Sequence, residues 1–233
     1  MTTAVTVAWL SLPGDAEEVI AREGFVVTGA ERTRADTYRR AVDRARSLLA
    51  AGLLRAVVAE HAGVRPAEVG VDRACHTCGR QHGRPVVALP ALLPPHVSVT
   101  HSGSWVGVAV SPGGPVGLDV EVRAAAASAP LHTVAAESER PGLRAAEDPG
   151  EALARLWVAK EAALKAAGHG LAVAPAHVVL SSDGTRVRRW PLADDPERTV
   201  IHCVDPDATH AGAVCVLDGR GSTVHPVRWD QRR

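Results

Sequence analysis

The chain has 233 residues, and 26 Lys and Arg residues balance 26 Asp and Glu residues, so its formal net charge at pH 7 is zero. A nucleic-acid-binding protein needs a surplus of basic residues to neutralise phosphates, so this class is disfavoured. An apolar content of 46% is typical of a water-soluble protein, no apolar run is long enough to span a membrane, and four cysteines are too few for a disulfide scaffold.

The first half of the chain is expected to hold a strand, a long helix, a polar loop and a hairpin. Alternating apolar residues predict a strand over 4–10, and apolar residues three or four apart predict a helix from Ala35 to about His61. The segment 75–85 is rich in polar residues and is expected to be a loop. Residues 97–110 predict two short strands around a tight Ser-Gly turn.

The second half begins after the strongest breaker in the chain, SPGGP at 111–115, which is a candidate domain junction. Residues 116–122 predict a strand, and the Ala-rich segment 123–148 predicts short helices joined by loops. A helix is expected to begin near Pro149, capped by the aspartate before it, and to stop at Gly168. Strands and turns are expected after it.

The predicted strand 116–122 carries two carboxylates on one face, because alternate side chains of a strand point the same way. Asp119 and Glu121 would lie side by side there, and a hard divalent cation such as Mg²⁺ would relieve their mutual repulsion. The alternative is a solvated acidic face on a half-exposed strand, which is the default for alternating sequences.

The predicted helix after Pro149 carries charged residues at the edge of an apolar stripe. Glu161 lies at that edge and Lys165 lies one turn further, while Lys160 falls inside the stripe. The stripe itself is formed by Leu153, Leu156, Trp157 and Leu164. Glu161 is therefore a candidate metal ligand or base and Lys165 a candidate phosphate contact. The alternative is a plain Glu161–Lys165 surface pair.

Lysine is almost absent from the chain, since 24 of the 26 basic residues are Arg. The two lysines, Lys160 and Lys165, stand five residues apart in this one helix. An ammonium carries and releases a proton more readily than a guanidinium, so the pairing indicates a site that requires lysine, although coincidence would also explain it.

Two further groups stand between predicted elements. A lone histidine such as His101 is more often a satisfied core or rim residue, but with Thr100 it could also contact a phosphate. Cys75 and Cys78, with His76 and His82, look like half of a zinc site. A structural zinc site usually needs two such pairs, and Cys203 and Cys215 are isolated and do not form a second one. We therefore expect neither zinc nor a redox pair there.

Four segments occur in an order that resembles the Sfp-type 4′-phosphopantetheinyl transferases. They are HGRP at 82–85, VTHSG at 99–103, GLDVE at 117–121 and WVAKEAALKAAGHGL at 157–171. The combination of an Asp-x-Glu strand with a Trp-x-x-Lys-Glu-Ala-x-x-Lys helix is the most specific part. Thr100 and Arg84 depart from the commoner Ser and Lys of the family, and both keep the donor or the charge.

The resemblance implies an α/β (α+β) fold of two similar subdomains, 1–112 and 113–233, related by a pseudo-two-fold axis with the active site in the cleft between them. A faint repeat supports two halves, because Thr-His-x-Gly precedes a Val-rich strand at Thr100 and again at Thr209. The implied enzyme is a 4′-phosphopantetheinyl transferase, or holo-carrier-protein synthase. It moves 4′-phosphopantetheine from coenzyme A to a serine of an apo carrier protein and releases adenosine 3′,5′-bisphosphate.

The resemblance also assigns roles to residues. Glu161 and Lys165 would be catalytic, and Asp119, Glu121 and Glu161 would bind Mg²⁺, with Mn²⁺ as a substitute. The positions that match coenzyme A contacts are Arg34, Arg46, Ser47, Arg84, Pro85, Thr100, His101, Asp119 and Lys165.

The implied partners are coenzyme A and apo acyl or peptidyl carrier domains of fatty-acid, polyketide or nonribosomal-peptide synthesis, with no nucleic acid and no membrane. We expect a cytoplasmic monomer, because the N-terminal segment lacks the basic start of a signal peptide and one chain would contain both walls of the cleft. Two other functions remain open. One is a metal-dependent phosphohydrolase that uses the same acids, and the other is a binding module that has lost turnover.

Overall fold

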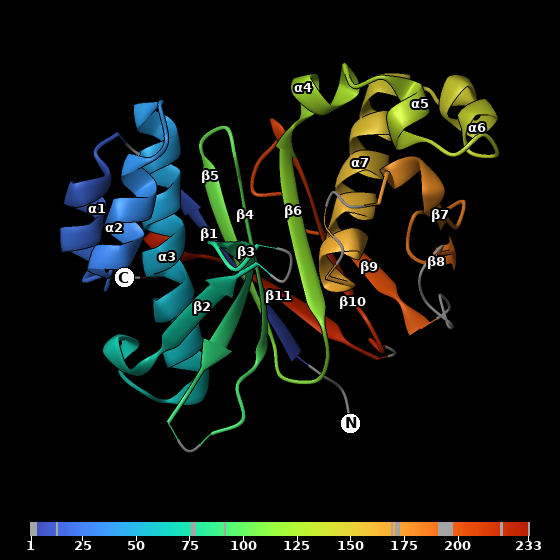
Figure 1. The fold of residues 1–233 in the computed structure, drawn as a ribbon. Helices are drawn as coiled ribbons and strands as arrows, with labels where there is room; N and C mark the ends of the chain where they lie inside the picture. The colour runs from blue at the N-terminus through green and yellow to red at the C-terminus, as the bar shows by residue number, and fades with distance from the viewer. Residues whose placement is uncertain are drawn as a thin grey trace.

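The computed structural model describes residues 4–12, 14–75, 78–90, 92–168, 170, 173–190, 198–219 and 221–232. Within these residues the fold is a mixed α/β arrangement with several sheets (Figure 1). Among the described helices, none combines the length and the apolar character needed to cross a membrane.

The first sheet has the strand order β11-β1-β5-β4. Its strands are β1 (Ala4–Ser11), β4 (His96–Ser102), β5 (Trp105–Ser111) and β11 (Thr223–Arg228). The predicted strand at the N-terminus and the hairpin over 97–110 are confirmed. Strand β11 pairs in parallel with β1, so the end of the chain returns to the sheet that its beginning forms.

The second sheet has the order β6-β10-β9, with β6 (Val116–Val122), β9 (Val200–Cys203) and β10 (His210–Val216). Two small hairpins complete the strands, β2 (Gly70–Ala74) with β3 (Gln81–Ala88) and β7 (Val179–Leu180) with β8 (Val187–Arg189). The prediction of a loop over 75–85 is wrong at its C-terminal end. From Gln81 onward the chain is strand β3, because pairing with β2 satisfies its backbone.

The N-terminal half contains α1 (Ala16–Glu23), α2 (Gly29–Asp36), α3 (Ala41–Ala62) and the short turn η1 (Pro66–Glu68). The helix expected from Ala35 is wrong at its start, since Ala35 belongs to α2 and a break separates it from α3. Thr28 and Glu31 cap the start of α2 with a reciprocal capping box, and α2 ends at its C-cap, Thr37. Arg40 is in an extended conformation just before α3 begins, so the two helices are separate. The break contains no glycine or proline, so the sequence carries no signal for it.

The C-terminal half contains the short helices α4 (Arg123–Ala127), α5 (Leu131–Val134) and α6 (Arg140–Ala145) and the long helix α7 (Pro149–Ala166). Short turns η3 (Pro175–His177) and η5 (Trp229–Gln231) follow. Helix α7 is confirmed together with its cap, because the Asp148 carboxylate accepts the backbone N–H of Glu151 at 2.9 Å.

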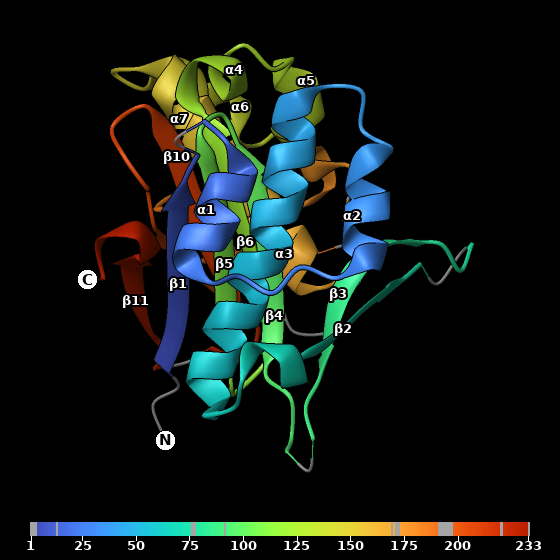
Figure 2. The same cartoon turned by 90° about the vertical axis from the view of Figure 1, so that its left-hand side faces the viewer.

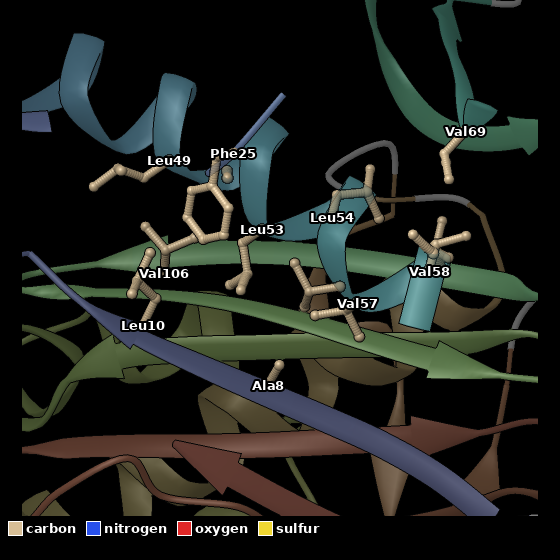
Figure 3. Packing of buried hydrophobic residues seen from close by; sticks show 14 of the residues in the cluster. Ala8, Leu10, Phe25, Leu49, Leu53, Leu54, Val57, Val58, Val69 and Val106 are labelled. Atoms are coloured by element: carbon tan, nitrogen blue, oxygen red, sulfur yellow. The ribbon is translucent and has the colours of Figure 1, made fainter. Parts of the chain in front are cut away.

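The two larger sheets pack against each other, and helices cover their outer faces (Figures 1 and 2). Leu10, Val106, Leu53 and Phe25 belong to the cluster between the first sheet, α1 and α3 (Figure 3). Each fully buried side chain of this kind contributes about 1.5–3 kcal/mol. The opposite face of β1 and β5 packs on β6 and β10 through Val7, Trp9, Trp105 and their neighbours.

Helix α7 lies directly on β6, and Gly117 makes this possible. A Cβ atom at Gly117 would overlap the carbonyl oxygen of Ala162 in α7. Strand β6 is therefore covered on both faces, with Leu118 and Val120 pointing between the sheets and Gly117 and Asp119 toward α7. This geometry brings the acidic residues of β6 close to those of α7.

Asp207 ties the two halves of the chain together. Its carboxylate accepts the indole N–H of Trp105 from β5 at 2.7 Å and lies 2.9 Å from Nδ1 of His210. Burial raises the pKa of Asp207, but the hydrogen bonds from Trp105, His210 and Thr209 outweigh it, so the net pKa lies well below its usual value.

We expect Asp207→Asn to lower the free energy of unfolding by about 1–2 kcal/mol at neutral pH. The pKa of Asp207 is lower in the folded state than in the unfolded state. The ionised carboxylate therefore contributes its full stabilisation above the unfolded-state pKa of about 3.9, and this stabilisation is lost as the pH falls toward the folded-state pKa. Urea unfolding of both proteins at pH 7 and pH 3 measures the difference, which should shrink at pH 3. The control is Asp218→Asn, which removes an exposed pair with Arg198 and should change stability little.

Candidate active site

A cleft of about 560 Å³ opens where the end of α2, the start of α3, β4, β6 and α7 approach one another. Figure 1 shows α3 and α7 on opposite sides of β4 and β6. The residues that line the cleft come from both halves of the chain: Arg34, Thr37, Tyr38, Ser47, Ala50, Arg73, Gln81, Val99, Thr100, His101, Asp119, Glu121, Trp157, Glu161, Lys165 and Gly170.

Asp119 and Lys165 form an ion pair at the floor of this cleft. The Lys165 ammonium lies 2.6 Å from Oδ1 of Asp119 and donates to the Leu118 carbonyl at 3.1 Å. Thr100 also donates to Oδ1 of Asp119, at 3.3 Å, and accepts from the backbone of Val120. Asp119 is only 5% exposed, so the solvated acidic strand face is wrong. The plain Glu161–Lys165 surface pair is wrong too, because Lys165 turns toward Asp119.

The other two carboxylates stand beside this pair. Ser102 donates to Oε2 of Glu121 at 2.6 Å, and burial together with the charge of Asp119 raises the pKa of Glu121. Glu161 is 6% exposed, and burial followed by the charge of Asp119 raises its pKa to about 6. Three acids therefore share one partly buried volume with a single lysine, which favours binding of a further cation.

The three acids do not converge in this arrangement. Within the described residues, no group of three or more His, Cys, Asp and Glu side chains is placed to hold a metal ion. The donors nevertheless fit a hard cation. Oδ2 of Asp119 and Oε1 of Glu161 are buried and have no hydrogen-bond partner among the described residues. Carboxylate oxygens are the ligands that Mg²⁺ prefers, and unpartnered buried oxygens are costly.

A basic wall stands across the cleft from the acids. Arg34 donates to the Ser47 hydroxyl at 3.3 Å, while Nε of Arg34 has no partner among the described residues. Arg73 of β2 joins this wall, and burial and the charge of Arg34 lower the pKa of Arg73 to about 10. Sequence reasoning missed Arg73, because only the β2–β3 hairpin brings it to the cleft. Two adjacent guanidinium groups favour an anionic ligand.

His101 lines the cleft on the same face of β4 as Val99. Desolvation and the positive charges of Arg46 and Lys165 lower the pKa of His101. An anion bound beside the ring would oppose this shift and favour the charged form of His101.

Three of the expected coenzyme A contacts lie around the cleft rather than in its lining. Arg46 of α3 donates through Nε to the Gly103 carbonyl at 3.1 Å and binds Asp43, so it clamps the β4–β5 turn. Arg84 of β3 donates to the Ala166 carbonyl at the end of α7 at 3.3 Å, and Pro85 after it is buried. The structure thus brings the other expected site residues together and places these at its border.

The second lysine has a different environment. Lys160 is fully buried and donates to the Val134 carbonyl at 2.9 Å and to Glu139 at 2.5 Å. It holds α5 and the start of α6 onto α7 and does not line the cleft. The idea that one site requires both lysines is therefore wrong, because Lys160 is structural.

The apolar stripe expected on α7 is also partly wrong. Leu153 and Leu164 are buried, but Leu156 and Trp157 are only partly buried, and Trp157 lines the cleft. Alanines supply most of the packed face, because their small size lets α7 approach β6 and β10 closely.

Comparison with known proteins agrees with this geometry. Residues 115–215 match the model of the 4′-phosphopantetheinyl transferase superfamily. The chain is 27% identical over 193 residues to a 4′-phosphopantetheinyl transferase of Bacillus subtilis, with 81% of each chain covered. It is 27% identical over 194 residues to the 4′-phosphopantetheinyl transferase psf-1 of Bacillus pumilus, covering 81% of this chain and 78% of the other.

The matched region spans β6, α7 and β10, which carry all three acids and Lys165. The resemblance inferred from the four sequence segments is thereby confirmed. The chain is therefore identified as a transferase enzyme that is similar to the 4′-phosphopantetheinyl transferases, and the match to the superfamily model lies within residues 115–215.

Proposed function

We propose that this enzyme transfers 4′-phosphopantetheine from coenzyme A to a serine hydroxyl of an apo carrier protein and releases adenosine 3′,5′-bisphosphate. The observation that carries the proposal is that acidic and basic side chains line different sides of the cleft. Three acids with Lys165 stand on one side, and Arg34, Arg73 and Ser47 stand on the other. A ligand with separate phosphate groups, such as coenzyme A, complements this division.

The basic wall would hold the phosphate at the adenosine end of coenzyme A. Arg34 and Arg73 supply charge, Ser47 and Thr100 supply hydroxyl groups, and His101 supplies a ring N–H. Arg84 and Pro85 would flank the adenine at the border of the cleft, and Arg46 would support the turn beside it. This anchoring would leave the pyrophosphate of coenzyme A next to Lys165.

The transfer breaks the bond between the β-phosphorus and the bridging oxygen and forms a bond from that phosphorus to the serine oxygen. Glu161 would accept the proton of the serine hydroxyl, directly or through water. Lys165 would stabilise the leaving phosphate or protonate it. Asp119, Glu121 and Glu161 would hold Mg²⁺, or Mn²⁺ in its place, and the ion would supply charge neutralisation at the pyrophosphate.

Two features support a fold of two related halves with the boundary at 112/113. This boundary falls between β5 and β6, and each half has one long helix, α3 or α7, on the outer face of a sheet. The last strand, β11, is the exception, since it crosses back and pairs with β1. Because both halves line the cleft, a monomer would contain a complete site. We propose an acyl or peptidyl carrier domain as the partner and the cytoplasm as the location.

Arg73→Ala is expected to raise KM for coenzyme A by about tenfold with little change in kcat, because one charge-assisted phosphate contact is worth about 1.5–3 kcal/mol. Steady-state kinetics with varied coenzyme A and a fixed carrier concentration measure this. Arg144→Ala on α6, an exposed arginine of the other half, is the control. If the KM for coenzyme A did not change, Arg73 would not contact this substrate.

Intact-mass spectrometry of a panel of apo carrier domains tests the reaction itself. Each carrier is incubated with the enzyme, coenzyme A and Mg²⁺, and a gain of one phosphopantetheine group that EDTA abolishes would establish the transfer. Coenzyme A binding by calorimetry with no mass gain on any carrier would instead support a binding module. Release of a phosphate or nucleotide without a carrier would support a phosphohydrolase.

A further inference from the structure

Cys75 and Cys78 lie in the turn that joins β2 to β3, away from the chemistry proposed above. The Cys75 backbone N–H donates to the Arg80 carbonyl at 2.9 Å, and the Gly79 N–H donates to the Cys75 carbonyl at 2.7 Å. These two bonds close the turn at both ends. A turn with this second bond brings residues three apart to about 5 Å between their Cα atoms, which is within the range that a disulfide requires.

The two thiols already touch in this turn. The side chains of Cys75 and Cys78 are within hydrogen-bond contact, and the Arg80 side chain also contacts the Cys78 sulfur. Cys78 is exposed and Cys75 is partly exposed, so both are open to a small reagent. A thiol beside a guanidinium forms its thiolate more easily than an isolated one, and the hydrogen bond from Arg80 lowers the pKa of Cys78.

The other two cysteines lack these features. Cys203 is exposed on β9, and Cys215 is buried on β10, where burial raises the pKa of its thiol to about 12. These two strands pair so that Cys203 is opposite Ala213 and Cys215 is opposite Ile201, which puts the two thiols out of register. The contact between thiols is thus specific to the β2–β3 turn among the described residues.

Although the sequence alone predicts no redox pair here, we propose that Cys75 and Cys78 are a reversible disulfide site that exchanges with low-molecular-weight disulfides. The Cys78 thiolate attacks one sulfur of the small disulfide and releases one thiol. The Cys75 thiolate then attacks the Cys78 sulfur and releases the second thiol. Two cysteines are oxidised to one disulfide, one small disulfide is reduced to two thiols, and the two protons pass from the cysteines to the released thiols.

The position of the turn links this site to the cleft. Arg73 and Gln81 flank the turn at its base, and both line the cleft. The backbone N–H of Arg73 donates to the Gln81 side chain at 2.9 Å, so the two strands are joined there. A disulfide in the turn would restrict the same hairpin that carries these two residues.

Thiol trapping of the full-length protein tests the proposal. The protein is equilibrated with graded ratios of reduced to oxidised glutathione, alkylated and digested with trypsin, which cuts after Arg73 and Arg80 and yields both cysteines in the single peptide 74–80. We expect this peptide to be unalkylated and about 2 Da lighter at ratios where Cys203 is still alkylated. Addition of dithiothreitol should restore two alkylated cysteines.

Cys75→Ser is the matched control, because Cys78 can then form only a mixed disulfide with glutathione. Its oxidised fraction at the same ratio should fall at least about fivefold. Two results would overturn the proposal. One is alkylation of both thiols in the wild-type protein at every ratio at which Cys203 is alkylated. The other is zinc that copurifies with the protein and protects both thiols from oxidation.

Discussion

Glu161→Gln is expected to lower kcat/KM for carrier modification by about 10²–10⁴-fold, which is the usual contribution of a general base. The same variant should be at least as stable as the wild-type protein in EDTA. The Glu161 carboxylate is buried beside Asp119 and Glu121, and its Oε1 has no partner among the described residues. Removing one of three like charges relieves repulsion, so activity and stability should change in opposite directions.

Carrier modification followed by mass spectrometry measures the first effect, and thermal unfolding with and without Mg²⁺ measures the second. Mg²⁺ should stabilise the wild-type protein more than the variant, because at one Mg²⁺ concentration the protein that binds the ion more tightly gains more folding free energy. Glu147→Gln, at an exposed position before α7, should change neither quantity. A Glu161→Gln enzyme with wild-type kinetics would remove this residue from the mechanism.

Lys160→Met is expected to lower the free energy of unfolding by about 3–5 kcal/mol, because it leaves the Glu139 carboxylate without its buried counter-charge. Glu139 also accepts backbone N–H groups from Ala136 and Leu180, so it cannot simply turn out to solvent. A loss of this size is a large part of the 5–15 kcal/mol that a typical protein has. Urea unfolding at pH 7 measures it.

The double variant Lys160→Met with Glu139→Gln distinguishes two causes of the lost stability, which are the unpaired charge of Glu139 and the lost packing of the Lys160 side chain. Because no buried charge remains, it should recover at least about half of the lost stability. The turnover of the folded fraction should stay close to that of the wild-type protein in both variants, since Lys160 does not line the cleft. If Lys160→Met were as stable as the wild-type protein but had a lower turnover, Lys160 would have a role in the active site and not a structural one.

Patterns between neighbouring residues are enough to predict the elements that carry the chemistry and the enzyme family that they resemble. Strand β6 with Asp119 and Glu121, and helix α7 with its aspartate cap, follow from short periods of two and three to four residues. Such patterns involve only residues close together in the chain, so a single sequence is enough to recognise them. The order of the four segments can also be read without knowing any contact between them, and it therefore pointed to one enzyme family.

Which side chains contact one another depends on how elements distant in the sequence pack together. Lys165 pairs with Asp119, 46 positions away, and not with Glu161 one turn before it, because α7 packs on β6 through Gly117. Arg73 reaches the cleft only because β2 and β3 pair, and Lys160 is structural only because α5 and α6 fold over α7. The energy of a charged group depends on its burial and its partner, and both arise from packing between distant segments.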